Sequence, residues 1–277
     1  MKLSVILVSH QAKNSLRLAL NALYKSNSAV EFEVIIVDNA SDDRTFEMLQ
    51  QSFPQVRIVT NPVFEGYSRA YNKAIRASKG TYVLLLSPDM MIKNDSIEKL
   101  CRFMDQHPLA GGSSVRMVDY NGDYLPESRY GLPAAWSTLL KFSGMGNYFP
   151  RSFSKQKGRG DWVKEFETSE ADTLHPDCML LRRSALEKTG WFDERFKSFG
   201  YNIDMAYRLR LSGFKTYYFS KTYLMQLPGK RLNKFSWTYI SNFYGAMFIF
   251  ATKYLFKLPV IRLKDIGEIY PSQYEVE

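Results

Sequence analysis

The chain has 277 residues, of which 45% are hydrophobic and 23% are charged, the composition of a globular protein that buries a substantial core. Its two cysteines, Cys101 and Cys178, exclude a disulfide framework and indicate a reducing compartment. The net charge of +9 fits an anionic partner such as nucleotide phosphates, lipid headgroups or nucleic acid, and does not choose between them. Because Met1 and Lys2 lead directly into a strand pattern, we expect no signal peptide and a cytoplasmic location.

The first hundred residues alternate between buried strands and amphipathic helices. Apolar runs predict strands at Leu3–Ser9, Phe32–Val37 and Val56–Val59. Apolar residues at helical spacing follow each strand, and the pattern predicts that Gly66 opens the third helix and that Asn94 caps the fourth. Four βα units in succession predict a parallel sheet with right-handed crossovers. No G-x-G-x-x-G follows the first strand, which argues against a dehydrogenase-type dinucleotide fold.

The fourth strand carries the most informative residue of the chain. The segment Thr81–Leu86 is almost wholly apolar and too short to span a membrane, so it predicts a strand buried on both faces. Pro88 ends it, because proline cannot donate to a sheet ladder. A single carboxylate, Asp89, then follows at the carboxyl end of the strand. Ligands of open α/β sheets bind at this edge, so we predict that Asp89 holds a divalent cation against a diphosphate.

The second half of the chain is less regular. Residues 125–170 mix Pro, Gly, aromatic and basic residues without a period, which is typical of a functional lid or a disordered segment. Order returns afterwards, with a capping box predicted at Ser184–Glu187 and a short helix closed by Gly190. The remaining predicted elements are strands at Gly111–Asp119, Cys178–Leu181 and Lys215–Phe219 and a helix from Asn202 to Gly213.

The segment Phe235–Phe256 is apolar almost all round, so it predicts a helix that must be buried somewhere. Polar residues interrupt it too often for a membrane span. One interpretation is packing on the sheet or on a second subunit. The alternative is docking on a membrane surface, with acidic headgroups near the basic residues Lys253, Lys257, Arg262 and Lys264.

The chain resembles the inverting family-two glycosyltransferases, which have a GT-A fold. The resemblance covers nearly the whole chain and rests on phrases in a fixed order: SVILVSH, EVIIVDNASDD, EGYSRAYNKAI, GTYVLLLSPD, YLPESRYGLP, CMLLRRSAL, GWFDERF and IDMAYRLRLSGFKTYYF. It implies an α/β fold of GT-A type with a mostly parallel central sheet flanked by helices. We expect the GT-A domain at residues 1–231 and a C-terminal helical extension at residues 232–277.

The resemblance also implies an activity. Such an enzyme moves a sugar from a nucleoside-diphosphate donor to a glycan acceptor with inversion, and the bacterial rhamnosyltransferase type acts in cell-surface polysaccharide biosynthesis. Bound Mg²⁺ or Mn²⁺ would neutralise charge on the departing diphosphate. A carboxylate would take the proton of the attacking hydroxyl.

Several residues match the nucleotide site of the family. By resemblance, Asp38 would accept a hydrogen bond from the nucleotide base, with Ser9 and Asn39 lining the same pocket. Arg69 and Asn72, on the helix opened by Gly66, could reach the diphosphate. Asp89 matches the last acidic residue of the metal motif, where the family has Asn-Pro-Asp and this chain has Ser87-Pro88-Asp89.

Other residues depart from the family, and the departures gather where the chemistry is expected. Asn202 stands for the Asp that acts as general base, and neutral Asn cannot accept a proton. Tyr201 stands for the preceding Glu, whereas Asp204 is kept as an alternative catalytic carboxylate. Gln226 falls where a metal-ligating His usually stands, and its carbonyl oxygen is a weak ligand for a hard cation.

Two further departures lie near the expected sugar pocket. Phe64 stands where relatives have Asn, and His175-Pro176-Asp177 replaces a stretch of small residues. Two hypotheses follow. In one, Asp177 or His175 has taken over as the base and the enzyme is active. In the other, the fold persists as a catalytically impaired relative that binds a nucleotide sugar or a partner protein.

The expected partners are a nucleoside-diphosphate sugar and a glycan or lipid-linked glycan acceptor. Contact with the inner membrane surface and homo-oligomerisation remain open alternatives. We expect no nucleic-acid partner, because the basic residues are spread widely and no nucleic-acid motif is present.

Overall fold

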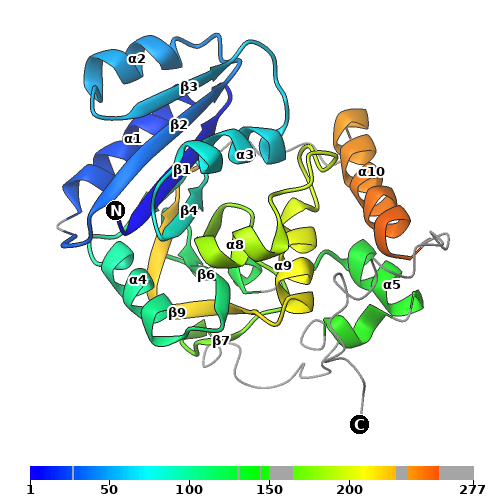
Figure 1. Ribbon diagram of the computed structural model, residues 1–277. Helices are drawn as coiled ribbons and strands as arrows, with labels where there is room; N and C mark the ends of the chain where they lie inside the picture. The colour runs from blue at the N-terminus through cyan, green and yellow to red at the C-terminus, as the bar shows by residue number, and fades with distance from the viewer. Residues whose placement is uncertain (27, 130–131, 144, 150–164, 229–235, 256–277) are drawn as a thin grey trace.

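A computed structural model describes residues 1–26, 28–129, 132–143, 145–149, 165–228 and 236–255. Within these residues the chain forms one nine-stranded sheet whose main path runs β3-β2-β1-β4-β8-β6-β9-β5, with β7 paired to β9. Figure 1 shows the sheet running through the molecule with helices on both of its faces. The predicted α/β class is therefore confirmed.

The amino-terminal half of the sheet is parallel, as the alternation of strands and helices predicts. β1 (Leu3–Ser9) pairs in parallel with both β2 (Phe32–Asn39) and β4 (Tyr82–Leu86), and β3 (Arg57–Asn61) pairs in parallel with β2. All of their carboxyl ends consequently meet at one edge of the sheet. The helices that join these strands are α1 (Lys13–Lys25), α2 (Thr45–Ser52) and α3 (Tyr67–Ala77).

The other half of the sheet is mixed rather than mostly parallel. β8 (Cys178–Arg182) runs antiparallel to both β4 and β6 (Ala110–Val118), and β9 (Lys215–Gln226) runs parallel to β6. Two short strands, β5 (Met90–Ile92) and β7 (Ser169–Glu170), pair antiparallel with β9. The βα periodicity that dictates parallel pairing ends after α4 (Ser96–Gln106), so nothing local in the sequence fixes the direction of the later strands.

Alternate residues of each strand point to opposite faces of the sheet and pack into two hydrophobic cores, one on each face. On one face, β-strand residues such as Val5 and Leu84 pack with α1, α2 and α4. On the other face, residues such as Ile6 and Leu85 pack with α3, α8 (Arg183–Thr189) and α9 (Tyr201–Leu211). The strands are apolar on both faces because helices cover both faces of the sheet.

The carboxyl-terminal helix α10 (Trp237–Tyr254) belongs to the second core. Figure 1 shows it beside α9 and α5 (Ala134–Phe142), on the side of the molecule away from α2. The ring centroids of Trp136 on α5 and Phe250 on α10 lie 5.3 Å apart, and both side chains are fully buried. α10 is therefore packed on the same body as the sheet. The predicted boundary at residue 231 lies outside the described residues and stays a prediction.

Some local predictions are wrong. Asp95, not Asn94, precedes α4, and no side chain of Ser184–Glu187 caps α8, which begins one residue before Ser184. The aperiodic segment 125–170 contains α5 and two 3₁₀ turns, η1 (Pro126–Ser128) and η2 (Met145–Tyr148). No local period marks α5, because its burial is set by a distant helix, α10. No helix among the described residues is long and apolar enough to cross a membrane.

A substitution at Gly80 would test how closely the chain before β4 packs against the backbone of β1. A Cβ at this position would lie 2.5 Å from the backbone nitrogen of Ser4 and 2.6 Å from the carbonyl carbon of Leu3. Backbone atoms of a central strand cannot yield, so Gly80→Ala should lower the free energy of unfolding by about 1–3 kcal/mol. Urea denaturation measures the change.

The matched control is Gly245→Ala. Gly245 lies within α10, and apart from its two chain neighbours and the nearby backbone of its own helix, no described atom lies within 4 Å of the point that an added Cβ would occupy. This change should therefore be neutral or raise stability by up to about 1 kcal/mol. Equal stability of the Gly80→Ala variant and the wild type would contradict the close approach.

Candidate active site

The carboxyl edge of the parallel strands gathers polar side chains with unpaired atoms. Ser9 ends β1, Asn39 ends β2, and Asp89 follows β4, which are three neighbouring strands. Ser9 Oγ, Asn39 Nδ2 and Asp89 Oδ1 are all buried and have no hydrogen-bond partner within the described part of the chain. A buried polar atom without a partner costs free energy, so three at one edge indicate a site built for a ligand.

The end of β2 forms one wall of this edge. Asp38 is 6% exposed, lies level with Ser9 across the sheet, and accepts a hydrogen bond from the backbone N–H of Ser41 at 3.2 Å through Oδ1. Asn39 Oδ1 accepts from Asn61 Nδ2 at 2.9 Å, which fixes the side chain and leaves its Nδ2 without a described partner. The predicted group of Ser9, Asp38 and Asn39 is thus brought together by the fold.

Two aromatic side chains that the sequence did not assign lie beside this wall. His10 contacts the backbone carbonyl of Asn39 through Nδ1 at 2.9 Å. Its ring centroid is 4.8 Å from that of Phe64, whose side chain is 42% exposed. Phe64, seen in the sequence only as a departure from a pattern, thus offers an exposed ring face next to Asp38 and Asn39.

The antiparallel pairing of β4 with β8 places Asp177 next to the Asp89 segment. Leu86 lies opposite Cys178 in the ladder, and the ladder continues as the Ser87 N–H donates to the carbonyl of Asp177 at 2.9 Å. Burial raises the pKa of the Asp177 carboxyl to about 7, with a smaller contribution in the same direction from the negative charge of Asp89. The structure therefore joins Asp89 and Asp177, although they are far apart in the sequence.

His175 lies against the same carboxylate. Its Nδ1 is 3.7 Å from Asp177 Oδ2 and also accepts the backbone N–H of Asp177 at 3.3 Å. Burial lowers the pKa of His175 to about 4, against the opposing effect of Glu127 and Asp89. At neutral pH the ring is therefore uncharged, and His175 orders Asp177 without forming an ion pair with it.

The β5–β9 ladder places the backbone of Gln226 beside that of Asp89. Gln226 lies opposite Met90 in the β5–β9 ladder, and the Leu227 N–H donates to the carbonyl of Asp89 at 2.8 Å. This register makes the two predicted metal ligands neighbours along the backbone.

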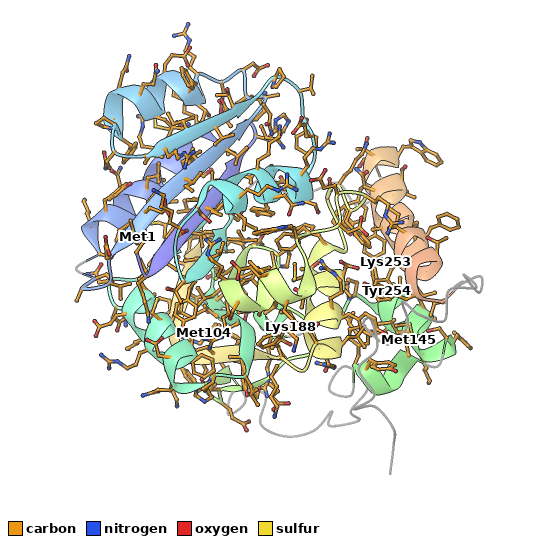
Figure 2. The ribbon with its side chains drawn as sticks, viewed as in Figure 1. Met1, Met104, Met145, Lys188, Lys253 and Tyr254 are labelled. Carbon is orange, nitrogen blue, oxygen red and sulfur yellow. The ribbon has the colours of Figure 1, made fainter. Side chains whose placement is uncertain are left out.

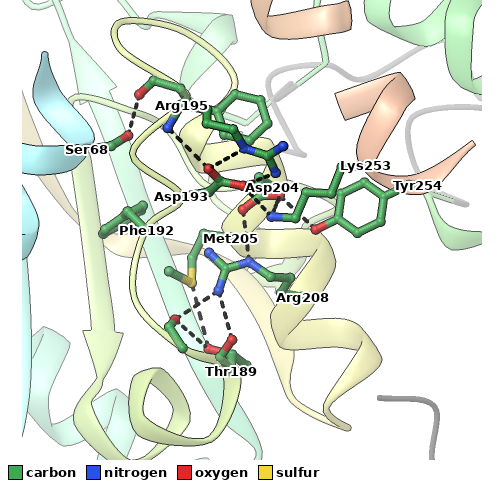
Figure 3. Close-up of polar contacts among 12 residues, drawn as sticks. Ser68, Thr189, Phe192, Asp193, Arg195, Asp204, Met205, Arg208, Lys253 and Tyr254 are labelled. Atoms are coloured by element: carbon green, nitrogen blue, oxygen red, sulfur yellow. Dashed lines mark hydrogen bonds and ion pairs between the residues drawn. The ribbon is translucent and has the colours of Figure 1, made fainter. Parts of the chain in front are cut away.

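Asn202 and Asp204 on α9 are buried and hydrogen-bonded within the fold. Asn202 is 7% exposed, and its Nδ2 donates to the carbonyl of Leu174 at 2.7 Å. Asp204 is fully buried: Oδ1 accepts from Lys253 Nζ and from the Tyr254 hydroxyl, each at 2.7 Å, and Oδ2 accepts from Arg208 Nε at 2.9 Å. Both oxygens of Asp204 thus accept hydrogen bonds from side chains of the fold (Figure 3).

The partners of Asp204 tie α10 to the rest of the fold. Lys253 Nζ also lies 3.0 Å from Asp193 Oδ2, and Asp193 is held in turn by Arg195 at 2.7 Å. Burial alone would raise the pKa of Asp193, but the hydrogen bonds from Arg195 and Lys253 lower it well below its usual value. Figure 2 shows Lys253 and Tyr254 on the side of α10 that faces α9.

Arg69 and Asn72 contact a loop rather than the open edge. Arg69 Nε donates to Glu194 Oε2 at 2.9 Å. Asn72 is 1% exposed, its Nδ2 donates to the carbonyl of Phe192 at 2.9 Å, and its Oδ1 accepts the Phe192 N–H at 3.0 Å. Asn72 is thus engaged through both of its amide atoms and positions the loop that precedes α9. Glu194 accepts hydrogen bonds from both residues. In the sequence, only its place in the phrase GWFDERF distinguishes it.

A match to a known protein family identifies the ancestry of the chain. The model of glycosyl transferase family 2 matches residues 4–190. The chain belongs to this family. The matched range includes β1, β2, β4 and β8, which contribute Ser9, Asn39, Asp89 and Asp177 to the sheet edge.

Curated relatives agree with this family. N-acetylglucosaminyl-diphospho-decaprenol L-rhamnosyltransferase of Mycobacterium tuberculosis is 27% identical over 197 residues, which are 67% of this chain and 63% of that protein. Poly(ribitol-phosphate) beta-N-acetylglucosaminyltransferase TarS of Staphylococcus aureus is 26% identical over 50% of this chain and 25% of its own length. The chain therefore matches less than two thirds of either relative.

Solved structures share the fold. TarS residues 1–349 in complex with UDP-GlcNAc superpose with a TM-score of 0.64 at 20% identity, over 91% of this chain and 66% of that one. A mannosyltransferase of Pyrobaculum calidifontis, in complex with GDP-Man and Mn²⁺, superposes with a TM-score of 0.58 at 18% identity, over 83% of this chain and 58% of that one. These likenesses support the family-two fold and leave the roles of single residues open.

One stability prediction follows from the cluster around Asp204. Asp204→Asn removes the buried charge that Lys253 and Arg208 face, so it should lower the free energy of unfolding by about 3 kcal/mol or more. Urea denaturation of Asp204→Asn, Lys253→Met and the double variant would show a coupling energy of about 0.5–3 kcal/mol. Additive losses would mean that the two side chains do not interact.

Proposed function

We propose that this protein transfers a sugar from a nucleoside-diphosphate donor to a glycan acceptor, with inversion and with the help of a divalent cation. The observation that carries the proposal is the set of buried atoms on Ser9, Asn39 and Asp89, at one sheet edge, that have no partner among the described residues. Membership of family two and the fold shared with nucleotide-sugar complexes support the same conclusion.

Nucleotide recognition is assigned to the end of β2. Asn39 Nδ2 and Ser9 Oγ offer a donor and a hydroxyl that lack partners in the described chain, and Asp38 has a second carboxylate oxygen for a base N–H. The ring of Phe64 is available to stack on the base. Arg69 has guanidinium N–H groups beyond the Nε that Glu194 holds, so it is kept as a diphosphate contact, and Asn72 is assigned a positioning role.

Asp89 fits a divalent cation. Its Oδ1 is buried without a partner among the described residues, and a carboxylate oxygen is a ligand that Mg²⁺ and Mn²⁺ prefer. No group of three or more His, Cys, Asp and Glu in the described ranges could hold a metal, so the diphosphate and water would supply most of the ligands. When bound, Mg²⁺ or Mn²⁺ would neutralise negative charge on the leaving diphosphate.

We assign the general base to Asp177 rather than to Asn202 or Asp204. Asp177 is the carboxylate that the β4–β8 pairing places at the edge with Asp89, and a third of its side chain is exposed. Its carboxylate would take the proton of the acceptor hydroxyl, while the hydrogen bond from the Asp177 N–H to His175 Nδ1 holds the backbone of Asp177 in place. Asn202 has no basic atom, and both oxygens of Asp204 are occupied.

The acceptor class is inferred from a relative. The M. tuberculosis relative is named for a diphospho-decaprenol acceptor, so a lipid-linked glycan is the favoured acceptor class here. Work on such an acceptor would take place at the cytoplasmic face of the inner membrane. Homo-oligomerisation stays an open prediction.

A second candidate function has its own observation. The resemblance places a catalytic carboxylate at two positions of α9. Position 202 carries an amide in place of the carboxylate, and the carboxylate of Asp204 is held by Lys253 and Arg208. This favours a catalytically impaired relative that binds nucleotide sugar or a partner protein. Release of nucleoside diphosphate from a panel of donors with a lipid-linked glycan acceptor separates the two, because only the transferase turns over.

The cation site gives a binding prediction. Asp89→Ala should abolish the Mn²⁺-dependent part of the affinity for UDP, dTDP or GDP, measured by calorimetry, because it removes the carboxylate assigned to the cation. Melting temperature should hardly change, because Asp89 Oδ1 makes no hydrogen bond to any described residue. Asp123→Ala, which removes an exposed carboxylate in a turn, is the control. Unchanged Mn²⁺-dependent affinity in Asp89→Ala would refute the assignment.

The base gives a kinetic prediction. Asp177→Asn should lower kcat by about 10²–10⁴-fold while nucleotide affinity stays within error, since only proton transfer is lost. The matched control is Asp123→Asn, which should keep wild-type kcat. A variant at Asp177 that turns over at the wild-type rate would place the base elsewhere.

A further inference from the structure

The side chain of Asn39 is the last member of a chain of hydrogen bonds that begins at Lys73 on α3. Asn39 ends β2 and lies opposite Asn61, the last residue of β3, in the parallel ladder. Asn61 Nδ2 donates to Asn39 Oδ1 at 2.9 Å, and Lys73 Nζ donates to Asn61 Oδ1 at 2.7 Å. We call these three residues, Lys73, Asn61 and Asn39, the amide relay.

The groups at the ends of the amide relay allow one orientation of both amides. The ammonium group of Lys73 has donors and no acceptor, so the amide oxygen of Asn61 must face it. The NH₂ group of Asn61 then faces Asn39, whose oxygen must accept from it. The backbone N–H of Glu65 donates to the same Asn39 oxygen at 3.3 Å. Turning either amide round would set like groups against each other at two contacts.

Burial makes a reversed amide costly. Asn39 is 0% exposed and Asn61 is 4% exposed, so water cannot replace the hydrogen bonds that a reversal would break. The ammonium group of Lys73 is itself held by Glu65, whose Oε2 lies 2.5 Å from Lys73 Nζ. The amide relay therefore turns Asn39 Nδ2, a donor without a partner in the described ranges, away from Asn61 and Glu65.

An aromatic surface lies next to this donor. The His10 ring contacts the backbone carbonyl of Asn39 through Nδ1 at 2.9 Å, and its centroid is 4.8 Å from that of the partly exposed Phe64 ring. A nucleotide base has a flat face that stacks on such a ring and an edge that forms hydrogen bonds. The base is therefore the part of a nucleotide that fits both Phe64 and Asn39.

We propose that Lys73, acting through Asn61, is a positioning residue that makes Asn39 present a hydrogen-bond donor to the nucleotide base, and that this donor selects bases with a keto group. Uracil, thymine and guanine carry a carbonyl oxygen where cytosine and adenine carry an amino group. An amino group would set donor against donor at Asn39 Nδ2 and leave both unpaired. The inference rests on the proposed function, which assigns nucleotide recognition to the end of β2.

Matched pairs of nucleotides test the selection by calorimetry in the presence of Mn²⁺. UDP and CDP form one pair, and inosine diphosphate and ADP form the other. The members of a pair differ only where one base has a keto group and a ring N–H and the other has an amino group and a bare ring nitrogen. Because both members carry the same diphosphate, their affinity ratio reports recognition of the base. In whichever pair binds, the wild type should favour the keto member by at least about tenfold.

Two nearly isosteric variants reverse the donor in different ways. Asn39→Asp keeps the oxygen that Asn61 and Glu65 need and replaces the NH₂ group by a second oxygen. Asn61→Asp keeps an acceptor for Lys73 but presents an oxygen to Asn39, so the Asn39 amide should turn round. Each variant should lower the keto preference by at least about fivefold. If Asn61 had only a structural role, its variant would weaken both members equally and leave the ratio unchanged.

Lysine 73 is tested by removal and by conservative replacement. Lys73→Met removes the group that fixes Asn61 and should also lower the keto preference. Lys73→Arg keeps a side chain with donors and no acceptor, so it should retain the preference. The matched control for added charge is Asn21→Asp, on an exposed position of α1, which should keep the wild-type ratio.

The outcomes separate the amide relay from the nucleotide site. A wild-type affinity ratio in Asn61→Asp or in Lys73→Met would overturn the relay, and so would equal affinity of the wild type for both members of the pair that it binds. In either case the nucleotide site itself would stand. A wild-type protein that binds none of the four nucleoside diphosphates would overturn the nucleotide site and the relay with it.

Discussion

The antiparallel pairing of β4 with β8 decides what chemistry the sheet edge can perform. β4 ends at this edge and β8 begins there, so the residue after one strand and the residue before the other become neighbours. The hydrogen bond from the Ser87 N–H to the carbonyl of Asp177 extends the ladder and fixes that neighbourhood. A carboxylate can thus reach the edge from the residue before β8. On the proposed assignment of the base to Asp177, the basic group would come from this element of the sheet rather than from position 202 on α9.

Sequence patterns predict the parallel half of the fold well and the mixed half poorly. Strand and helix periods in the first hundred residues are local signals, and they suffice because each βα unit dictates the direction of the next strand. The direction of β8 depends on its pairing with β4 and β6, which lie about seventy to a hundred residues earlier in the chain. The sequence of α5 shows no helical period of apolar residues, and the helix is buried through the contact of its Trp136 with Phe250 of α10. Such long-range contacts leave no trace in a local pattern.

The same distinction separates the site residues. Ser9, Asp38, Asn39 and Asp89 follow predicted strands, so their place at one edge can be foreseen from strand order alone. Asn72 and Asp204 lie on correctly predicted helices, but their roles depend on partners elsewhere, Phe192 for one and Lys253 for the other. The position of Gln226 could not be foreseen for a further reason: the predicted strand Lys215–Phe219 is seven residues shorter than β9, so its register against Met90 could not be known.

Asp204 links the first turn of α9 to the carboxyl-terminal helix α10. The first turn of α9 carries Asn202, whose amide holds the carbonyl of Leu174 next to His175 and Asp177. Two residues later, Asp204 holds Lys253 and Tyr254 of α10 by buried contacts, and burial together with the charge of Asp204 raises the pKa of Tyr254, which keeps its hydroxyl a donor. One turn of helix therefore contacts both the segment that precedes Asp177 and the carboxyl-terminal helix α10. The Asp204 carboxylate acts here as a structural group, because its removal would break the buried contacts that join α9 to α10.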